Sequence, residues 1–291
     1  MQDFKSKLEE LKNILSASAK EKMVGVATTA DINNPPIIFG STRETETTIA
    51  VTIILRDTSF VDEIINTFDG VADYFMIDPE VKNEAGNLES VILPKIKKSK
   101  YFIYKPNDFT VDSLDTLVAL LFGTLLGKKV LIIGAGNIGS KIALKLCERG
   151  ANVFLFDKDL EKTKTIIEGL NLVKRSKSLI LASENILEGA KDADLVIGCT
   201  PGVPIIDKNI AEAMKEGGKI IDAGNRTVVP EALATARARG IEVLSLSSLG
   251  GYTGMVENFL FQREILEKPR MKNLGDCCLI TPGTLGGKGD I

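Results

Sequence analysis

The sequence predicts an α/β protein in which a Rossmann domain, a doubly wound parallel sheet, is preceded by a smaller α/β substrate domain. The first observation is an apolar run at residues 130–133 that leads directly into a glycine-rich turn and then a helical pattern. The second is the alternation of short apolar runs with helical stretches on both sides of that turn, which is typical of parallel strands joined by helices. A length of 291 residues is enough for two modest domains.

Residues 1–115 are expected to form the smaller domain. The chain starts with a charged amphipathic helix, and the apolar stretches at 24–27 and 37–39 predict a hairpin-like or irregular segment after it. Strands are then expected at 49–55, 74–77 and 101–104, and helices at 59–68 and 88–98. A long apolar helix over 112–126 leads into the second domain, so we place the boundary along it.

Residues 116–267 are expected to form the Rossmann domain, and residues 268–291 a tail. The strands expected after the one at 130–133 lie at 153–156, 179–182, 195–199, 219–223 and 243–247. The helices expected between and after them lie at 160–170, 184–190, 208–215, 229–239 and 255–266. The Gly- and Pro-rich tail is expected either to be loosely ordered or to fold back onto the first domain.

The glycine-rich turn has the G-x-G-x-x-G spacing of a dinucleotide-binding fingerprint. Gly134 allows the tight turn, Gly136 lets the backbone approach a pyrophosphate, and Gly139 lets the helix pack close to the strand. Free N–H groups at the start of that helix attract phosphate. Asp157 follows Gly134 by 23 residues, where a carboxylate can accept ribose hydroxyls. These features predict bound NAD, with NADP as an alternative because Lys158 and Lys162 can partly offset the carboxylate charge.

The other predicted cofactor contacts come from loops that follow strands, because ligands of open α/β sheets lie beyond the carboxyl ends of the strands. Small residues in these loops let the backbone approach a flat ring. The residues expected to contact the cofactor, besides the three glycines and the acid, are Asn137, Ile138, Lys158, Cys199, Thr200, Pro201, Asn225, Gly254 and Met255.

Composition argues against several classes of protein. A net charge of −3 gives no indication of nucleic-acid or anionic-membrane binding. No apolar run reaches the roughly 20 residues of a membrane helix, and the charged N-terminus does not resemble a signal peptide. The four cysteines form no C-x-x-C pair, so reduced thiols in the cytoplasm are expected. The predicted partner is a small-molecule substrate, and a homo-oligomer stays open.

The chain contains no histidine, which removes the commonest general base and zinc ligand. We therefore expect no metal site, and proton transfer must use Lys, Asp, Glu, Tyr, Cys or water. Polar candidates for substrate contact or proton transfer follow the strands of the first domain in three groups, and one further candidate lies on a helix. They are Arg56-Asp57-Thr58, Asp78 with Glu80 and Lys82, Lys105 with Asn107 and Asp108, and Lys95.

The arrangement resembles a group of two-domain dehydrogenases: shikimate dehydrogenases, methylene-tetrahydrofolate dehydrogenases and methylene-tetrahydromethanopterin dehydrogenases. Residues 192–226 look like the folate-dehydrogenase stretch around the nicotinamide, and residues 56–78 are similar to the opening of the methanopterin-type enzymes. Residues 248–259 resemble a shikimate-dehydrogenase helix start, which implies that Met255 packs near the nicotinamide. The Lys-Asp catalytic pair of the shikimate enzymes has no clear match; Lys95 or Lys105 with Asp108 or Asp112 are positional candidates.

Three functions are consistent with these features. The favoured one is hydride transfer between NAD(P) and a methylene-tetrahydropterin carrier in one-carbon metabolism, since that chemistry needs no protein base. A shikimate-like hydroxy- or keto-acid dehydrogenase with a lysine base is the second. A non-catalytic NAD-sensing module is the third, and a cleft plugged by the tail or by apolar side chains would favour it.

Overall fold

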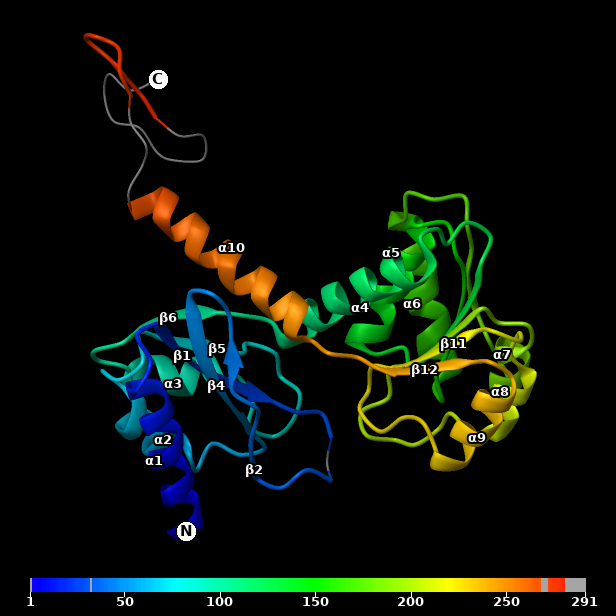
Figure 1. The fold of residues 1–291 in the computed structure, drawn as a ribbon, viewed down its shortest axis with the longest axis horizontal. Helices are drawn as coiled ribbons and strands as arrows, with labels where there is room; N and C mark the ends of the chain where they lie inside the picture. Colours follow the sequence, from blue (N-terminus) through cyan, green and yellow to red (C-terminus); the bar gives the residue numbers. More distant parts are fainter. Residues whose placement is uncertain (1, 32, 268–271, 281–291) are drawn as a thin grey trace.

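The computed structural model describes residues 2–31, 33–267 and 272–280, and it consists of two α/β domains side by side (Figure 1). Each domain is built on a six-stranded sheet. The expected fold class, a Rossmann sheet preceded by a smaller α/β domain, is confirmed. No helix in these residues is both long and apolar enough to cross a membrane.

The first domain has a mostly parallel sheet with strand order β2-β4-β1-β5-β6, and β3 pairs with β4. β2 and β3 run antiparallel to β4, and the other pairs are parallel. The strands are β1 (Glu21–Thr28), β2 (Ile37–Phe39), β3 (Arg43–Glu44), β4 (Thr48–Leu55), β5 (Tyr74–Ile77) and β6 (Lys100–Ile103). The helices are α1 (Gln2–Ser16), α2 (Val61–Phe68), α3 (Leu88–Ile92) and the short 3₁₀ helix η1 (Leu93–Lys95).

Two sequence predictions for this domain were wrong. The hairpin-like segment at 24–27 is part of β1, a central strand that pairs with parallel strands on both sides. Its residues from Met23 onward are buried without interruption, the pattern of a parallel strand covered on both faces. The helix predicted over 88–98 ends early as a 3₁₀ turn, because Pro94 has no N–H to continue the helical hydrogen bonds.

The Rossmann sheet is entirely parallel, with strand order β12-β11-β10-β7-β8-β9. Its strands are β7 (Lys129–Ile133), β8 (Asn152–Phe156), β9 (Ile180–Ala182), β10 (Leu195–Gly198), β11 (Lys219–Asp222) and β12 (Glu242–Ser245). Its helices are α5 (Asn137–Glu148), α6 (Leu160–Val173), α7 (Ile186–Ala190), α8 (Lys208–Ala213) and α9 (Pro230–Ala238). Of the predicted tail, residues 272–280 contain the hairpin β13 (Lys272–Asn273) and β14 (Cys278–Leu279), and the rest lies outside the described residues.

Two long helices, α4 (Pro106–Phe122) and α10 (Leu249–Glu267), connect the domains (Figure 1). α10 follows the Rossmann domain in sequence, but its buried Tyr252, Val256 and Leu260 pack on the first sheet. α10 starts six residues before the helix predicted at 255–266. A Cβ at Gly251 would lie 1.9 Å from the Phe109 carbonyl oxygen, so this close crossing of α4 requires glycine despite its low helix propensity.

Ion pairs link α4 to α5 at regular intervals. Asp108 pairs with Lys141, and Asp112 lies 3.0 Å from Lys145. Asp115 accepts two hydrogen bonds from Arg149, at 2.6 and 2.9 Å. These acids recur about once per turn along α4 and face bases spaced in the same way along α5. The linking helix is thereby fixed to the helix that follows the glycine turn.

We predict that Asp108→Asn destabilises the protein at neutral pH and not in acid. Burial opposes ionisation, but hydrogen bonds from Lys105 and Lys141 outweigh it and hold the pKa of Asp108 below its usual value. A depressed carboxyl pKa contributes stability above the unfolded-state value near 4 and loses it as the pH falls through the folded-state value.

The half-exposed pair should contribute roughly 0.5–1 kcal/mol, because solvent screens it. Thermal unfolding at pH 7 and pH 2.5 measures the difference between wild type and variant. An equal difference at both pH values would show that the Asp108 charge is not responsible.

Candidate functional site

The glycine-rich turn has the geometry that a dinucleotide requires. Gly134 has a φ of +110°, and its N–H donates to the Phe156 carbonyl at 2.7 Å. A Cβ at Gly139 would lie 1.8 Å from the Gly134 carbonyl oxygen, so only glycine allows this contact between strand and helix. A Cβ at Gly136 would meet no atom within 4 Å. The space beside Gly136 is therefore open, where a pyrophosphate would lie.

Asp157 lies at the end of β8 and supports the turn. One carboxylate oxygen, Oδ2, accepts a hydrogen bond from the Ala135 N–H at 2.8 Å, and Oδ1 lies 3.3 Å from the Asp159 nitrogen. A carboxylate has about four acceptor sites, so it can still accept ribose hydroxyls. Lys158 and Lys162 are both exposed nearby in sequence, and Lys162 also lines the cleft described next.

A cleft of about 630 Å³ lies between the two domains. The carboxyl ends of β1, β5 and β6 reach it from the first domain, and those of β7 and β10 reach it from the Rossmann domain. The first domain lines it with Ala27, Thr28, Thr29, Ala30, Arg43, Thr52, Ile54, Val81, Lys82, Tyr104, Pro106, Asn107, Phe109 and Thr110. The Rossmann domain contributes Gly136, Asn137, Ile138, Lys162, Cys199 and Pro201.

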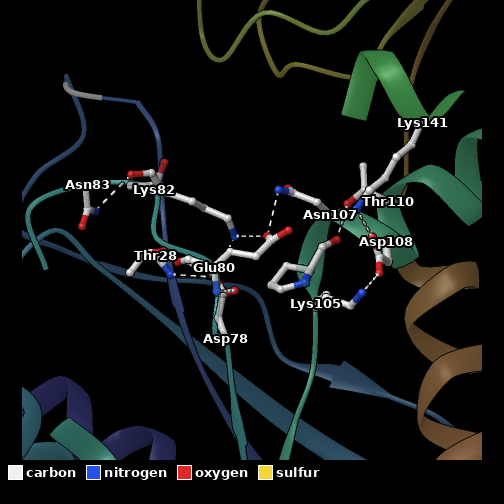
Figure 2. A network of polar contacts seen from close by, with 12 residues as sticks. Thr28, Asp78, Glu80, Lys82, Asn83, Lys105, Asn107, Asp108, Thr110 and Lys141 are labelled. Carbon is white, nitrogen blue, oxygen red and sulfur yellow. Dashed lines mark hydrogen bonds and ion pairs between the residues drawn. The ribbon is translucent and has the colours of Figure 1, made fainter. Parts of the chain in front are cut away.

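Lys82 is a cleft residue that lies within a network of polar contacts (Figure 2). Its ammonium lies 2.6 Å from Asp78 and 2.9 Å from Glu80, and only 12% of its side chain is exposed. Asn107 donates to Glu80 at 2.8 Å. Asp78 is fully buried and also accepts the Thr28 N–H at 3.2 Å. Two carboxylates therefore hold a lysine in one position at the edge of the cleft.

Tyr104 lines the same cleft from the end of β6. Burial raises the pKa of its hydroxyl well above the usual value, and the nearby Asp78 charge raises it further. The hydroxyl therefore stays protonated at neutral pH. It can donate a hydrogen bond to a bound molecule but does not act as a base.

The three residues predicted to be catalytic lie outside this cleft. Lys95 is on η1 and forms an ion pair with Asp62 of α2. Lys105 lies 2.8 Å from Asp108, and this hydrogen bond raises the pKa of Lys105, which disfavours its action as a base. Lys105 and Asp108 line a second hollow beside α10. Sequence analysis included Lys82 among the polar candidates at strand ends. Its position after β5, the strand next to the central β1, distinguishes it from Lys95 and Lys105.

The predicted cofactor residues divide into two groups. Asn137, Ile138, Cys199 and Pro201 line the cleft beside the glycine turn. Burial raises the pKa of the Cys199 thiol, so it stays protonated.

Thr200, Asn225, Gly254 and Met255 are not among the residues that line the cleft, although the Thr200 backbone lies beside Gly134. Thr200 donates to the Val203 carbonyl at 3.2 Å, and Asn225 has a φ of +62° in the turn after β11. Gly254 is on α10, and Met255 lines the second hollow with Lys105. In the described part of the chain, no group of three or more Cys, Asp or Glu is placed to hold a metal ion.

The fold and the glycine turn have the features of a two-domain α/β protein that binds a dinucleotide. Residues 116–243 match the family model of shikimate / quinate 5-dehydrogenase. This match supports the shikimate part of the predicted resemblance. The methylene-tetrahydrofolate part finds no support.

Curated relatives match the chain over shorter stretches. Glutamyl-tRNA reductase of Archaeoglobus fulgidus is 28% identical over 153 residues, which are 51% of this chain and 33% of that protein. The same enzyme of Campylobacter jejuni is 34% identical over 73 residues, 25% of this chain and 17% of that protein. The chain thus spans a third or less of the length of these relatives.

Solved structures match the chain at low identity. A shikimate dehydrogenase in complex with NADP+ is 14% identical, with a TM-score of 0.46, over 78% of this chain and 85% of that chain. A chorismate mutase/shikimate 5-dehydrogenase fusion protein from Clostridium acetobutylicum is 11% identical, with a TM-score of 0.47, over 83% of this chain and 91% of that chain.

We predict that Gly136→Val folds and loses cofactor affinity. The valine side chain would enter the open space beside the turn and collide with a pyrophosphate. Titration of NADH and NADPH fluorescence should show affinity reduced at least about tenfold, or ~1.4 kcal/mol. Gly139→Ala is the matched comparison: its Cβ would collide with backbone, so it should lower the melting temperature instead. Unchanged affinity in a folded Gly136→Val protein would contradict the assignment of the turn.

Proposed function

We propose that this protein is an NAD(P)-dependent dehydrogenase that transfers hydride between the cofactor and a hydroxyl- or carbonyl-bearing small molecule held in the cleft. The observation that carries the proposal is the position of Lys82: it lines the same cleft as Gly136 and Cys199 of the cofactor-binding domain. A candidate proton-transfer group therefore shares one cavity with the loops beyond the Rossmann strands, where we expect the nicotinamide.

Lys82 supplies what the reaction requires apart from hydride. Oxidation of an alcohol carbon releases a hydride from C–H and a proton from O–H, and the nicotinamide accepts the hydride when bound. In the direction of reduction, the Lys82 ammonium donates a proton to the carbonyl oxygen as negative charge develops there. Asp78 and Glu80 hold this ammonium in position, and Asn107 fixes Glu80. Asn107 also lines the cleft, where its carbonyl oxygen can accept a substrate hydroxyl.

The two other candidate functions receive less support. The preference for a methylene-tetrahydropterin carrier is not supported by the family model that matches, shikimate / quinate 5-dehydrogenase. The polar side chains that line the cleft, Lys82, Asn107 and Arg43, favour an enzyme over a sensing module. The hydroxy- or keto-acid dehydrogenase is therefore the reaction we propose.

We predict that Lys82→Met lowers kcat by about 100-fold or more at saturating cofactor, as expected for loss of a general acid–base group. Lys95→Met is the matched control, because it removes an equivalent charge outside the cleft and should leave kcat unchanged. Activity is measured with a panel of hydroxy acids. If Lys82→Met changed only KM, Lys82 would contribute to substrate binding and not to proton transfer. A large loss in Lys95→Met would restore that lysine as the catalytic candidate.

We predict that the wild-type protein binds NADH more tightly than NADPH. Asp157 at the ribose position should repel a 2′-phosphate, since close like charges cost several kcal/mol. Asp157→Asn keeps an oxygen that accepts the Ala135 N–H but removes the charge. Parallel fluorescence titrations should show that the variant loses tenfold or more of the preference. Tighter binding of NADPH by the wild type would mean that Lys158 or Lys162 determines the choice.

A further inference from the structure

Arg43 is a cleft residue near α10 whose positive charge is not paired with a carboxylate in the described part of the chain. It lies on β3, in register with Ala50 of β4, and its side chain reaches the cleft. Lys82, the other cation contributed by the first domain, is neutralised by two carboxylates. Among residues 2–31, 33–267 and 272–280, the side chain of Arg43 has one hydrogen-bond partner, the Ser248 hydroxyl at 3.3 Å, and no carboxylate within ion-pair distance.

Aromatic rings hold the guanidinium in place. Its central carbon lies 5.2 Å from the centre of the Phe109 ring and 5.0 Å from that of the Tyr252 ring. Tyr252 is fully buried, and the two rings meet edge to face. Such contacts orient a guanidinium and remove part of its water without neutralising it. The positive charge therefore remains available to a ligand.

Lys162 lines the cleft as well, but from the opposite domain. It is in the first turn of α6 and shares the cleft with Gly136 and Asn137 of the glycine turn. That position suits the phosphates of the cofactor. Arg43 lies instead against Phe109 of α4, which also lines the cleft, and against the buried Tyr252 of α10.

We propose that Arg43 binds a carboxylate of the substrate and so makes the protein selective for organic acids. A guanidinium presents paired N–H groups whose geometry matches the two oxygens of a carboxylate. The Ser248 contact uses one terminal nitrogen, which leaves the other edge for the ligand. This inference rests on the proposed function in one respect: the acid is taken to be the molecule whose hydroxyl or carbonyl meets Lys82. Two anchors within one cleft fix the orientation of a small molecule.

Equilibrium binding tests the proposal without turnover. The probes are 3-hydroxycyclohexanecarboxylate and 2-hydroxybutanoate, each beside its neutral carboxamide, and ligand-observed NMR measures binding with and without NADH. The wild type should bind at least one acid about 10- to 100-fold more tightly than its amide, the range of a charged hydrogen-bonded pair. Arg43→Gln should abolish this preference. Arg43→Lys keeps the cation over the rings but not the paired N–H groups, so this variant should retain part of the preference for acid over amide.

Controls separate a binding role from a structural one. Arg237→Gln removes an exposed arginine from α9 and should leave the preference intact. NADH affinity should be unchanged in Arg43→Gln, because a loss would assign Arg43 to the cofactor. If Arg43 only clamps α10 to the first sheet, its variants lose melting temperature while the ratio of acid to amide binding stays constant. That result would overturn the proposal.

The remaining outcomes distinguish this proposal from the proposed function. Acid binding through Arg43 without hydride transfer would support the anchor and reject the dehydrogenase. Turnover of hydroxyl compounds with no preference for acid over amide would support the dehydrogenase and reject the anchor. Displacement of the probes by inorganic phosphate at lower concentration than by either acid would reject the carboxylate in favour of a phosphate. Absence of acid preference in every wild-type measurement would also overturn the proposal.

Discussion

The close packing of α4 against both α5 and α10 is the constraint on which the site depends. α4 begins with Pro106, directly after the polar end of β6, and its acids pair with the bases of α5. One turn further along, Phe109 contacts Gly251 so closely that no side chain fits between the helices. The carboxyl ends of two separate sheets therefore face the same space.

The polar network at Lys82 is the second requirement, and it carries a cost. Asp78 is fully buried, and a buried carboxylate without partners is strongly unfavourable. Lys82, the Thr28 N–H and the Glu80 N–H supply those partners. In many proteins, replacing such a buried charged cluster by well-packed apolar side chains leaves the stability of the protein unchanged or raises it. Retention of the buried charge at the edge of the cleft is therefore more readily explained by function than by folding.

Local features of the site could be predicted from the sequence, and long-range ones could not. The roles of Gly134, Gly136 and Gly139 follow from spacing within one turn, because a strand, a turn and a helix are determined by neighbouring residues. The choice between Lys82 and Lys95 depends on which strand lies beside β1 and which end of it faces the second domain. That information is in the strand order. The strand order could not be predicted while residues 24–27 were interpreted as a hairpin-like segment.

The contact between Arg43 and α10 is a second long-range feature that the sequence does not predict. Nothing in the sequence around β3 indicates that its arginine lies over an aromatic ring contributed by residue 252. The contact exists because α10 leaves the Rossmann domain and packs on the first sheet, where Tyr252 and Phe109 meet at the crossing of α10 and α4. Sequence patterns assigned α10 to the domain it follows, since amphipathic periodicity reports that a face is buried and not against what.

A site without histidine can still move a proton when two oppositely acting requirements are met. The group must be held in one position, and its charge must be balanced without being buried out of reach. Lys82 meets both, because two carboxylates compensate its charge while the cleft keeps it accessible. The task proposed for Arg43 in the same cavity is different: a guanidinium carries N–H donors and no acceptor, so it suits the attraction and orientation of a carboxylate. The proposed division of labour, in which a lysine transfers the proton and an arginine binds the substrate, follows from the chemistry of the two side chains.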